Sequence, residues 1–277
     1  MASSSKSISS ESWLIILYRW LQAFGIEGMK FVHALRYLPL TIKEYHTLSA
    51  QNDRGEPKYR LKFNYPCLVD RHYPSGVASG DYFHQDLLVA RRIFQHKPVK
   101  HVDVGSRIDG FVAHVATFRP IEVFDIRPLK TNVQNIIFRQ YNMMSDNKRL
   151  IVTDNYCDSI SCLHALEHFG LGRYGDPIDI DGHLRGFNNL YRILKPNGIL
   201  YLSVPIGTER IEFNAHRVFN IKTILEYAKD RFELLEFSFV DDNGELHENM
   251  TLNSHNMANN FGCHCGCGIF VLRKRAR

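Results

Sequence analysis

The sequence predicts an α/β protein in which a mostly parallel, Rossmann-like sheet carries helices on both faces. From about residue 80 onward, short apolar runs alternate with segments of helical spacing. The run 101–104 leads into Gly105, and the next apolar run, 121–125, ends in Asp125. A strand, a glycine turn, a helix and a second strand that ends in an acid are typical of the opening βαβ unit of a nucleotide-binding fold.

Length and composition favour one main domain with an N-terminal extension. The chain has 277 residues, of which 44% are hydrophobic, so it can bury a full core. We expect residues 1–57 to form a disordered start, amphipathic helices and a linker, and residues 58–277 to form the main domain. The net charge of +5 comes from 34 basic and 29 acidic residues, a balance too even to indicate a nucleic-acid partner. We expect a cytoplasmic protein with reduced cysteines.

The N-terminal extension contains an apolar helix over residues 13–24. Its apolar side chains recur at helical spacing, and Gly25 follows as a stop: Trp13, Ile16, Leu17, Trp20, Leu21 and Phe24. A helix of this length reaches about 18 Å, whereas a bilayer core is about 30 Å thick. We therefore expect it to pack on the main domain or on a partner, or to lie on a membrane surface as a peripheral anchor. More helix is expected over 29–50, broken at Leu38-Pro39, and a linker over 51–57.

The main domain is predicted to alternate strands and helices. A helix over 82–96 precedes the first strand, and two later helices cover about 184–194, ended by Pro196 to Gly198, and 221–229. The connection between the second and third strands is short, so the helix usually found there is expected to be clipped. The predicted strands cover 101–104, 121–125, 135–140, 158–163, 199–205, 232–240 and 267–273.

The glycine turn and the acid point to a nucleoside-containing cofactor. A small-residue turn lets main-chain N–H groups approach a ligand at a helix N-terminus, and Asp125 can accept hydrogen bonds from a ribose diol. A dinucleotide fingerprint is incomplete, because Arg107 stands between Gly105 and Gly110 where a glycine is required. The Lys-Ser/Thr pair of a phosphate-binding loop is also missing after Gly110. S-adenosylmethionine, which has an adenosine ribose and no pyrophosphate, fits better than NAD, and Asn142 lies where it can contact the adenine.

With these residues in place, the chain from about residue 80 to the C-terminus resembles the class I S-adenosylmethionine-dependent methyltransferases. The matching segments are 102–105, 123–125, 158–168 and 194–200. More narrowly, the blocks 83–86, 170–176 and 214–218 look like an uncharacterised methyltransferase-like family found in nematodes and bacteria, which has no assigned reaction.

The resemblance implies a seven-stranded sheet with one antiparallel strand near its edge and S-adenosylmethionine at the carboxyl ends of the first, second and fourth strands. It also implies roles for individual residues in the cofactor site: Asp103, Gly105 and Ser106 beside the methionine moiety, Asp125 on the ribose, Asn142 near the adenine, and His164 and Leu166 along the transferred methyl. Arg107, in the loop that ends at Gly110, departs from the family's second glycine. It either pairs with the cofactor carboxylate or fills the pocket.

Methyl transfer needs mainly the correct positioning of the methyl donor and the acceptor, and it needs a base when the acceptor carries a proton. Three candidate bases follow predicted strands or precede a helix at the carboxyl edge of the sheet: His168, Asp181 and His216. His216 is the first candidate, because it lies beyond Pro205 at the rim where acceptors enter α/β folds. Residues near these bases are candidates for acceptor binding or for structural ion pairs: Arg173, Tyr174, Asp176, Asn214 and Arg217. The sequence thus predicts methyl transfer to a small polar acceptor, such as a carbohydrate hydroxyl; the alternative is a methyltransferase-shaped binding module without catalysis.

The cysteine cluster Cys263, Cys265 and Cys267 does not predict a metal site. Tetrahedral zinc sites use wider spacings and a distant second pair of ligands. Cysteines at alternate positions where a strand begins are the simpler interpretation, and no metal is expected.

Overall fold

The computed structural model describes residues 13–54, 58–145 and 152–276. It contains two compact units, Met1–Val77 and Ala78–Arg277. The predicted serine-rich disordered start lies outside the described residues. The boundary between the units follows Val77, whereas the sequence prediction placed the domain boundary after residue 57.

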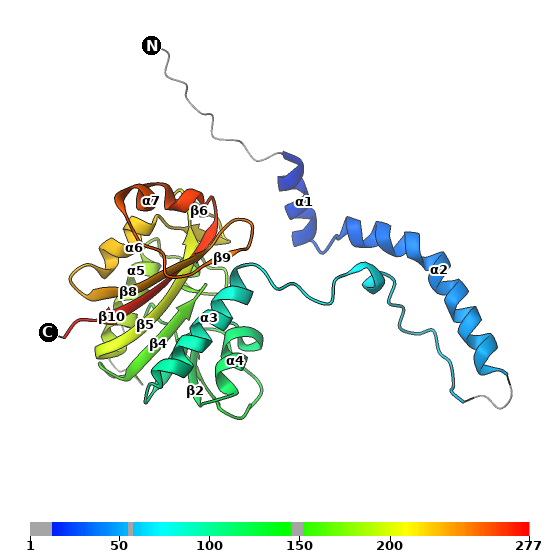
Figure 1. Ribbon diagram of the computed structural model, residues 1–277, viewed down its shortest axis with the longest axis horizontal. Coiled ribbons are helices and arrows are strands. Elements are labelled where there is room, and N and C mark those ends of the chain that lie inside the picture. The colour runs from blue at the N-terminus through cyan, green and yellow to red at the C-terminus, as the bar shows by residue number, and fades with distance from the viewer. Residues whose placement is uncertain (1–12, 55–57, 146–151, 277) are drawn as a thin grey trace, which may run out of the picture. The chain divides into compact units, whose positions relative to one another are not determined.

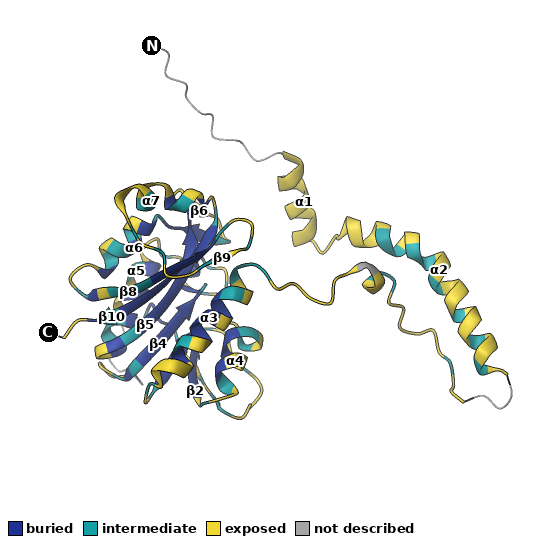
Figure 2. Ribbon diagram, viewed as in Figure 1, coloured by how far each residue is buried: buried dark blue, intermediate teal, exposed yellow. Residues whose placement is uncertain are grey.

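The first unit consists of two helices, α1 (Trp13–Ala23) and α2 (Gly28–Asn52), and a short turn of 3₁₀-helix, Asp70–His72. No residue of either helix is buried (Figure 2). The predicted break at Leu38-Pro39 is wrong, because Pro39 lies inside a continuous α2. Since the helix is exposed, water can satisfy the carbonyl that the proline leaves without a donor. Among the described residues, no helix combines the length and the apolar character needed to cross a membrane.

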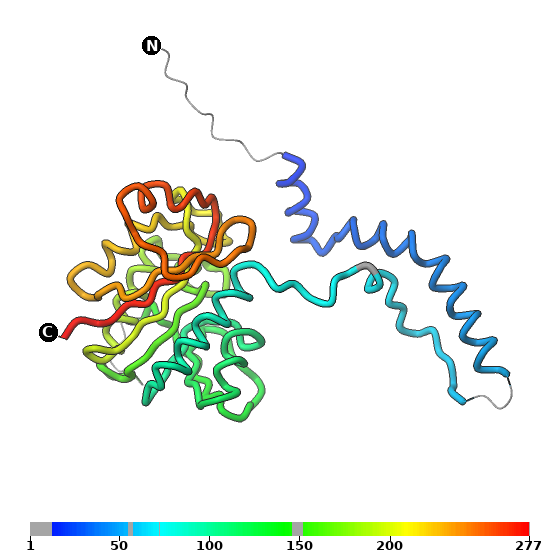
Figure 3. Tube along the Cα trace, viewed as in Figure 1, coloured from blue at the N-terminus to red at the C-terminus, as the bar shows by residue number. Residues whose placement is uncertain are grey.

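The second unit is built on an eight-stranded sheet in the order β3-β2-β1-β4-β5-β10-β8-β9 (Figure 1). Strands β1 to β5 pair with one another in parallel, and β10 runs between β5 and β8 and is antiparallel to both (Figure 3). The predicted fold class is therefore confirmed, with the two-residue β9 added at one edge. The strands are β1 (His101–Val104), β2 (Ile121–Asp125), β3 (Ile136–Gln140), β4 (Cys157–Leu163), β5 (Leu194–Ile206), β8 (Phe232–Val240), β9 (Leu246–His247) and β10 (Gly266–Lys274).

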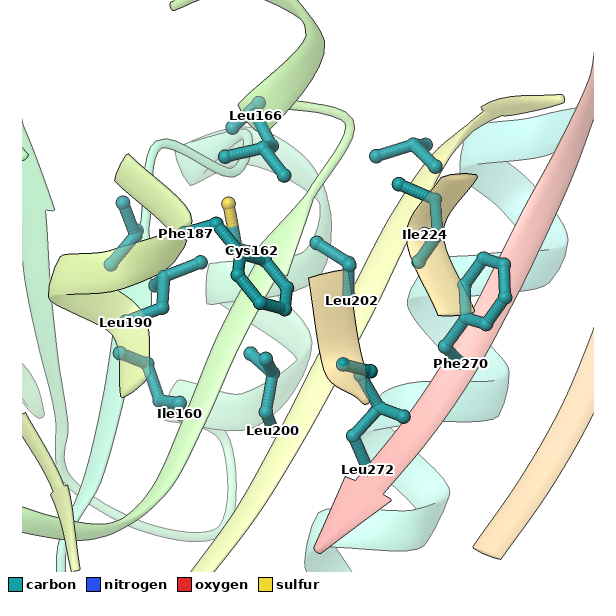
Figure 4. Packing of buried hydrophobic residues seen from close by; sticks show 14 of the residues in the cluster. Ile160, Cys162, Leu166, Phe187, Leu190, Leu200, Leu202, Ile224, Phe270 and Leu272 are labelled. Atoms are coloured by element: carbon teal, nitrogen blue, oxygen red, sulfur yellow. The ribbon is translucent and has the colours of Figure 1, made fainter. Parts of the chain in front are cut away.

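Helices cover both faces of this sheet, and each face has its own apolar core. On one face lie α3 (Asp81–His96) and the short pair formed by a π-helical turn, Ile108–Val112, and α4 (Ala113–Ala116). On the other lie α5 (Gly182–Ile193) and α6 (Ile221–Ala228), whose apolar side chains meet those of β4, β5 and β10 (Figure 4). The inner strands β1, β2, β4 and β10 are almost entirely buried, as expected for a sheet covered on both faces, whereas the edge strands β3 and β9 are not.

Several smaller elements differ from the prediction. The helix predicted to reach residue 194 ends at Ile193, because Leu194 already pairs with Cys157 of β4 as part of β5. The sequence also gave no indication of a hairpin formed by β6 (Arg210–Glu212) and β7 (His216–Val218), or of α7 (Ser254–Asn259). These elements lie at the end of the sheet where the site described next is found.

Candidate functional site

A cavity lies at the carboxyl ends of β1, β2 and β4. Its empty volume of about 520 Å³ includes space that is open to solvent. Its polar wall includes Gly105, Asp125, Asn142, His164 and His168. Its apolar wall comes mainly from residues that follow β2, β3 and β4: Ile126, Tyr141, Met143, Met144 and Phe169. Four of the residues predicted to bind the cofactor and one predicted base therefore share one cavity.

The loop after β1 is fixed by hydrogen bonds to the buried carboxylate of Asp103. Asp103 accepts hydrogen bonds from the Ser106 main-chain N (3.1 Å), the Ser106 Oγ (2.6 Å) and the Ser161 Oγ (2.6 Å). Burial raises the pKa of Asp103 to about 6. Gly105 has φ of +72°, and a Cβ there would come within 2.9 Å of the Ala165 Cβ. Asp103 and Ser106 thus shape the loop, and Gly105 permits both its left-handed backbone and the close approach of Ala165.

Arg107 does not fill the cavity, and its predicted pairing with the cofactor carboxylate stays a prediction. Its Nε and Nη2 donate to the two carboxylate oxygens of Asp109 at 3.2 and 3.1 Å, and its guanidinium lies 5.2 Å from the centre of the Tyr82 ring. It does not line the cavity. The glycine at position 110 has a local explanation, since a Cβ there would lie 2.6 Å from the Asp86 Oδ2.

Asp125 reaches the cavity as predicted, but its carboxylate is occupied by Arg127. The main-chain N and the Nε of Arg127 donate to Oδ1 at 2.8 and 3.1 Å, and Nη2 donates to Oδ2 at 2.8 Å. The guanidinium also lies 4.3 Å from the centre of the Tyr174 ring. A ribose diol must therefore compete with Arg127 for this carboxylate. Arg127 is not among the residues predicted for the site, although its position two residues after Asp125 could have indicated an ion pair with this acid.

Asn142 lines the cavity, whereas Leu166 lies in the apolar core. The Asn142 Oδ1 accepts from the Met144 main-chain N at 2.9 Å, which shapes the turn that carries Met143 and Met144 into the cavity wall. Leu166 is fully buried in the core beside α5 and does not line the cavity (Figure 4).

His164 and Glu167 form a buried ion pair next to the cavity. The His164 Nδ1 lies 3.1 Å from the Glu167 Oε1. Burial opposes a charged imidazole, but Cys267 and Glu167 outweigh it and hold the pKa of His164 well above its usual value. The fully buried carboxyl of Glu167 has its pKa lowered by His164, against the effect of burial. His164 also has a φ of +47°, which is uncommon for a residue with a Cβ and is frequent at functional sites.

His168 faces the same carboxylate from the other side. Its Nδ1 lies 2.7 Å from the Ala215 carbonyl oxygen, so Nδ1 carries the proton. Its Nε2 lies 3.5 Å from the Glu167 Oε1. Burial lowers the pKa of His168, which favours the neutral ring with an available lone pair on Nε2. Glu167 was missed by the sequence analysis, although it lies between two residues predicted to line the site.

The remaining candidate base residues lie elsewhere. His216 begins β7, and its Nε2 lies 3.9 Å from the Cys265 Sγ; burial lowers its pKa. Asp181 immediately precedes α5 and lines a separate cavity with His183 and Arg217. Of the three predicted bases, His168 alone lines the cavity at the carboxyl ends of β1, β2 and β4.

The predicted acceptor-binding residues are mostly structural. Arg217 is buried and donates to the carbonyl oxygens of Glu167 (3.2 Å), Phe169 (2.6 Å) and Ile180 (3.1 Å). The Asp176 carboxylate accepts from three main-chain N–H groups of its own loop. Arg173 donates to the Ala215 carbonyl at 3.0 Å, Asn214 is exposed, and Tyr174 lines the cavity.

The cysteines do not form a metal centre in the part of the chain that the structure describes, where no group of three or more suitable side chains gathers. Cys263 and Cys267 are buried, and Cys265 is partly exposed near His216.

Comparison with solved structures finds low-identity likenesses. The N-methyltransferase NodS from Bradyrhizobium japonicum, in complex with S-adenosyl-L-homocysteine, has 12% identity and a TM-score of 0.46, covering 84% of this chain and 98% of its own. The 1,6-didemethyltoxoflavin-N1-methyltransferase of Burkholderia thailandensis has 11% identity and a TM-score of 0.48, covering 90% and 91%. The [4+2]-cyclase SpnF has 16% identity and a TM-score of 0.49, covering 70% and 82%. Likenesses this distant say nothing about activity.

Sequence comparison is more specific about the family. No curated protein matches the chain. Residues 125–275, which run from the end of β2 to the end of β10 and make up more than half of the sequence, match a family described as "Caenorhabditis protein of unknown function, DUF268". The chain therefore belongs to this DUF268 family.

Proposed function

We propose that this protein transfers a methyl group from S-adenosylmethionine to a small polar acceptor. The observation that carries the proposal is the cavity at the carboxyl ends of β1, β2 and β4, which brings Gly105, Asp125 and Asn142 together. In an α/β sheet, ligands bind at this edge, where the strand order reverses. The family resemblance of the motifs around these residues supports the same cofactor.

The cavity residues fit an adenosine-containing ligand. The Asp125 carboxylate would bind the ribose hydroxyls once Arg127 releases it, and the apolar side chains after β3 would enclose the adenine. When bound, S-adenosylmethionine supplies an electrophilic methyl group.

His168 is the best-placed base for an acceptor that carries a proton. Its Nδ1–H is fixed on the Ala215 carbonyl, so Nε2 is the atom that can take a proton. The Glu167 carboxylate, 3.5 Å from Nε2, would stabilise the imidazolium that results. His216 is the alternative base, because it is half-buried close enough to Glu167 and His168 for their charges to act on its pKa. Asp181 would act only on a ligand in the second cavity.

A hydroxyl of a carbohydrate is the acceptor that we propose. Among the residues that line the cavity, His164, His168 and Tyr174 provide donors and acceptors at neutral pH.

A binding module without catalysis is the second candidate function. The bidentate ion pair between Asp125 and Arg127 favours it, because this pair occupies the group that would hold the ribose. A module of this kind could still bind a ligand in the cavity but would transfer nothing.

Incubation of the full chain with methyl-labelled S-adenosylmethionine and fractionated cell extract separates the two functions. An enzyme will transfer label to one or more fractions, and the His168→Ala variant will transfer far less. If no fraction takes up label while S-adenosylhomocysteine binds normally, the binding module is the better description.

A further inference from the structure

Asp81 and His164 face each other from the walls of two different cavities. Asp81 begins α3, and its Oδ2 lies 3.9 Å from the His164 Nε2. His164 lines the cavity described above, whereas Asp81 lines a second, more open cavity together with Asp241, Asp242 and Cys265. The pair therefore stands between the two cavities.

The His164 ring has one nitrogen without a hydrogen-bond partner. Its Nδ1 faces Glu167, while its Nε2 is buried and unpartnered among the described residues. The side chain is only 9% exposed. Cys267 and Glu167 favour the charged ring, in which Nε2 is a donor, and Nε2 makes no hydrogen bond of ordinary geometry to the described residues. Buried donors in this state are rare and call for a ligand or an ordered water.

The gap between the two groups suits a bridging oxygen. A distance of 3.9 Å is too long for a hydrogen bond. An oxygen at about 2.8 Å from both atoms would see them at an angle of about 90°, which permits two hydrogen bonds. A hydroxyl oxygen can accept from the His164 Nε2–H and donate to the Asp81 carboxylate at the same time.

Other ligand groups do not satisfy both sides of this gap. An ammonium group has no lone pair for the His164 N–H, and a carboxylate has no proton for Asp81. The neighbouring Asp241 and Asp242 add negative charge to the second cavity, which further disfavours anions. Both of these carboxylates are already held by partners, Asp242 by the main-chain N of His264 and Cys265, and Asp241 by His247.

We propose that Asp81 and His164 bind one hydroxyl group of the acceptor, with Glu167 positioning the His164 ring. The inference rests on the proposed function and narrows it, because it selects hydroxyl-bearing acceptors over amines and acids. A water molecule makes the same two bonds, so an acceptor hydroxyl can replace it without leaving either group unpaired. Asp81 and His164 are binding residues in this account, and His168 remains the base.

The test uses the full chain with ¹⁵N-labelled histidine and follows the His164 ring nitrogens by NMR. Glycerol serves as a polyol probe, and propylammonium serves as an amine of similar size. We expect glycerol to shift the His164 Nε2 signal and propylammonium to leave it unchanged. In Asp81→Asn, the response to glycerol should fall at least tenfold. Asp230→Asn is the matched control, since Asp230 is exposed and asparagine tolerates its φ of +60°.

Calorimetry with S-adenosylhomocysteine on the same samples shows that Asp81→Asn is folded and keeps the two hypotheses apart. Binding of S-adenosylhomocysteine without any response of wild-type His164 to glycerol would overturn the hydroxyl site, as would an equal response to propylammonium. A glycerol response in a protein that does not bind S-adenosylhomocysteine would support the hydroxyl site and overturn the proposed function.

Discussion

Under the proposed function, Arg127 would compete with the cofactor for Asp125. The Arg127 side chain is 48% exposed, and ion pairs of this kind contribute about 0–1 kcal/mol. Removing it should therefore leave S-adenosylmethionine affinity unchanged or up to about fivefold tighter, because the ligand no longer has to displace a side chain. Titration of Arg127→Ala by calorimetry checks this. A loss of tenfold or more would mean that Arg127 itself contacts the ligand.

His168 should carry the acid–base chemistry. A positioned base contributes about 10²–10⁴ in rate, so His168→Ala should lose turnover on that scale while S-adenosylhomocysteine binding changes little. His216→Ala and Asp181→Ala are the comparison variants, measured with label from S-adenosylmethionine. If the loss appears in His216→Ala instead, the predicted first candidate is the base. Similar losses below tenfold in all three variants would remove the base from the mechanism.

At the residue scale, the sequence predicted which residues lie at the ends of strands better than which side chains contact one another. Gly105, Asp125 and His168 follow predicted strands, and the register of a parallel sheet brings them to one edge. Arg127 and Glu167 act on residues close in sequence, but their roles depend on side-chain directions that the sequence does not show. Asp81 and Arg217 were beyond reach for another reason, because their partners are distant in sequence: His164 for Asp81, and for Arg217 three carbonyl groups in the connection between β4 and α5.

At the scale of single elements, β1 carries a buried histidine that should make stability depend on pH. His101 contacts the Ser159 and Ser161 hydroxyls at 2.8 and 3.1 Å, and burial lowers its pKa to about 3. In the unfolded chain this pKa is about 6.5. The stabilisation is therefore fully present above pH 6.5 and is lost as the pH falls toward 3, by about 1.4 kcal/mol per pH unit.

Urea denaturation at pH 7 and pH 5.5 measures this effect. The wild-type free energy of unfolding should fall between the two pH values, and the fall should be smaller in His101→Gln, which cannot take up a proton. An equal fall in both proteins would show that His101 is not the group responsible.

The long, strongly patterned elements were predictable, and the short ones were not. Strands such as β5 and β10 are buried on both faces and appear in the sequence as apolar runs. The hairpin of β6 and β7 and the edge strand β9 have only two or three residues each, too few to show an alternation. The unbroken α2 around Pro39 depends on solvent exposure, which the local sequence does not reveal.

For the molecule as a whole, α1 is the feature that the proposed function does not use. Trp13 and Trp20, the two tryptophans of the chain, both lie in α1 and are 69% and 62% exposed. Tryptophan fluorescence therefore reports on this helix alone. We propose membrane-surface binding through α1, because aromatic side chains favour the bilayer interface.

Adding anionic lipid vesicles should shift the tryptophan emission to shorter wavelength if α1 enters the interface. A variant with Trp13 and Trp20 changed to Phe provides the blank, and vesicle sedimentation of Leu17→Glu should show weaker binding than wild type. Unchanged emission at saturating lipid would exclude this surface as the partner and favour packing on a protein.

The central claim is that the cavity binds S-adenosylmethionine through Asp125, and calorimetry of the full chain tests it most directly. Wild type should bind S-adenosylmethionine and S-adenosylhomocysteine. Asp125→Ala should bind them roughly 10- to 100-fold more weakly, because hydrogen bonds to a charged group contribute about 1.5–3 kcal/mol. Asp109→Ala is the matched control, since Asp109 pairs with Arg107 outside the cavity, and its affinity should stay within about threefold of wild type. Wild-type protein that gives no heat with either compound but binds NAD would contradict the account.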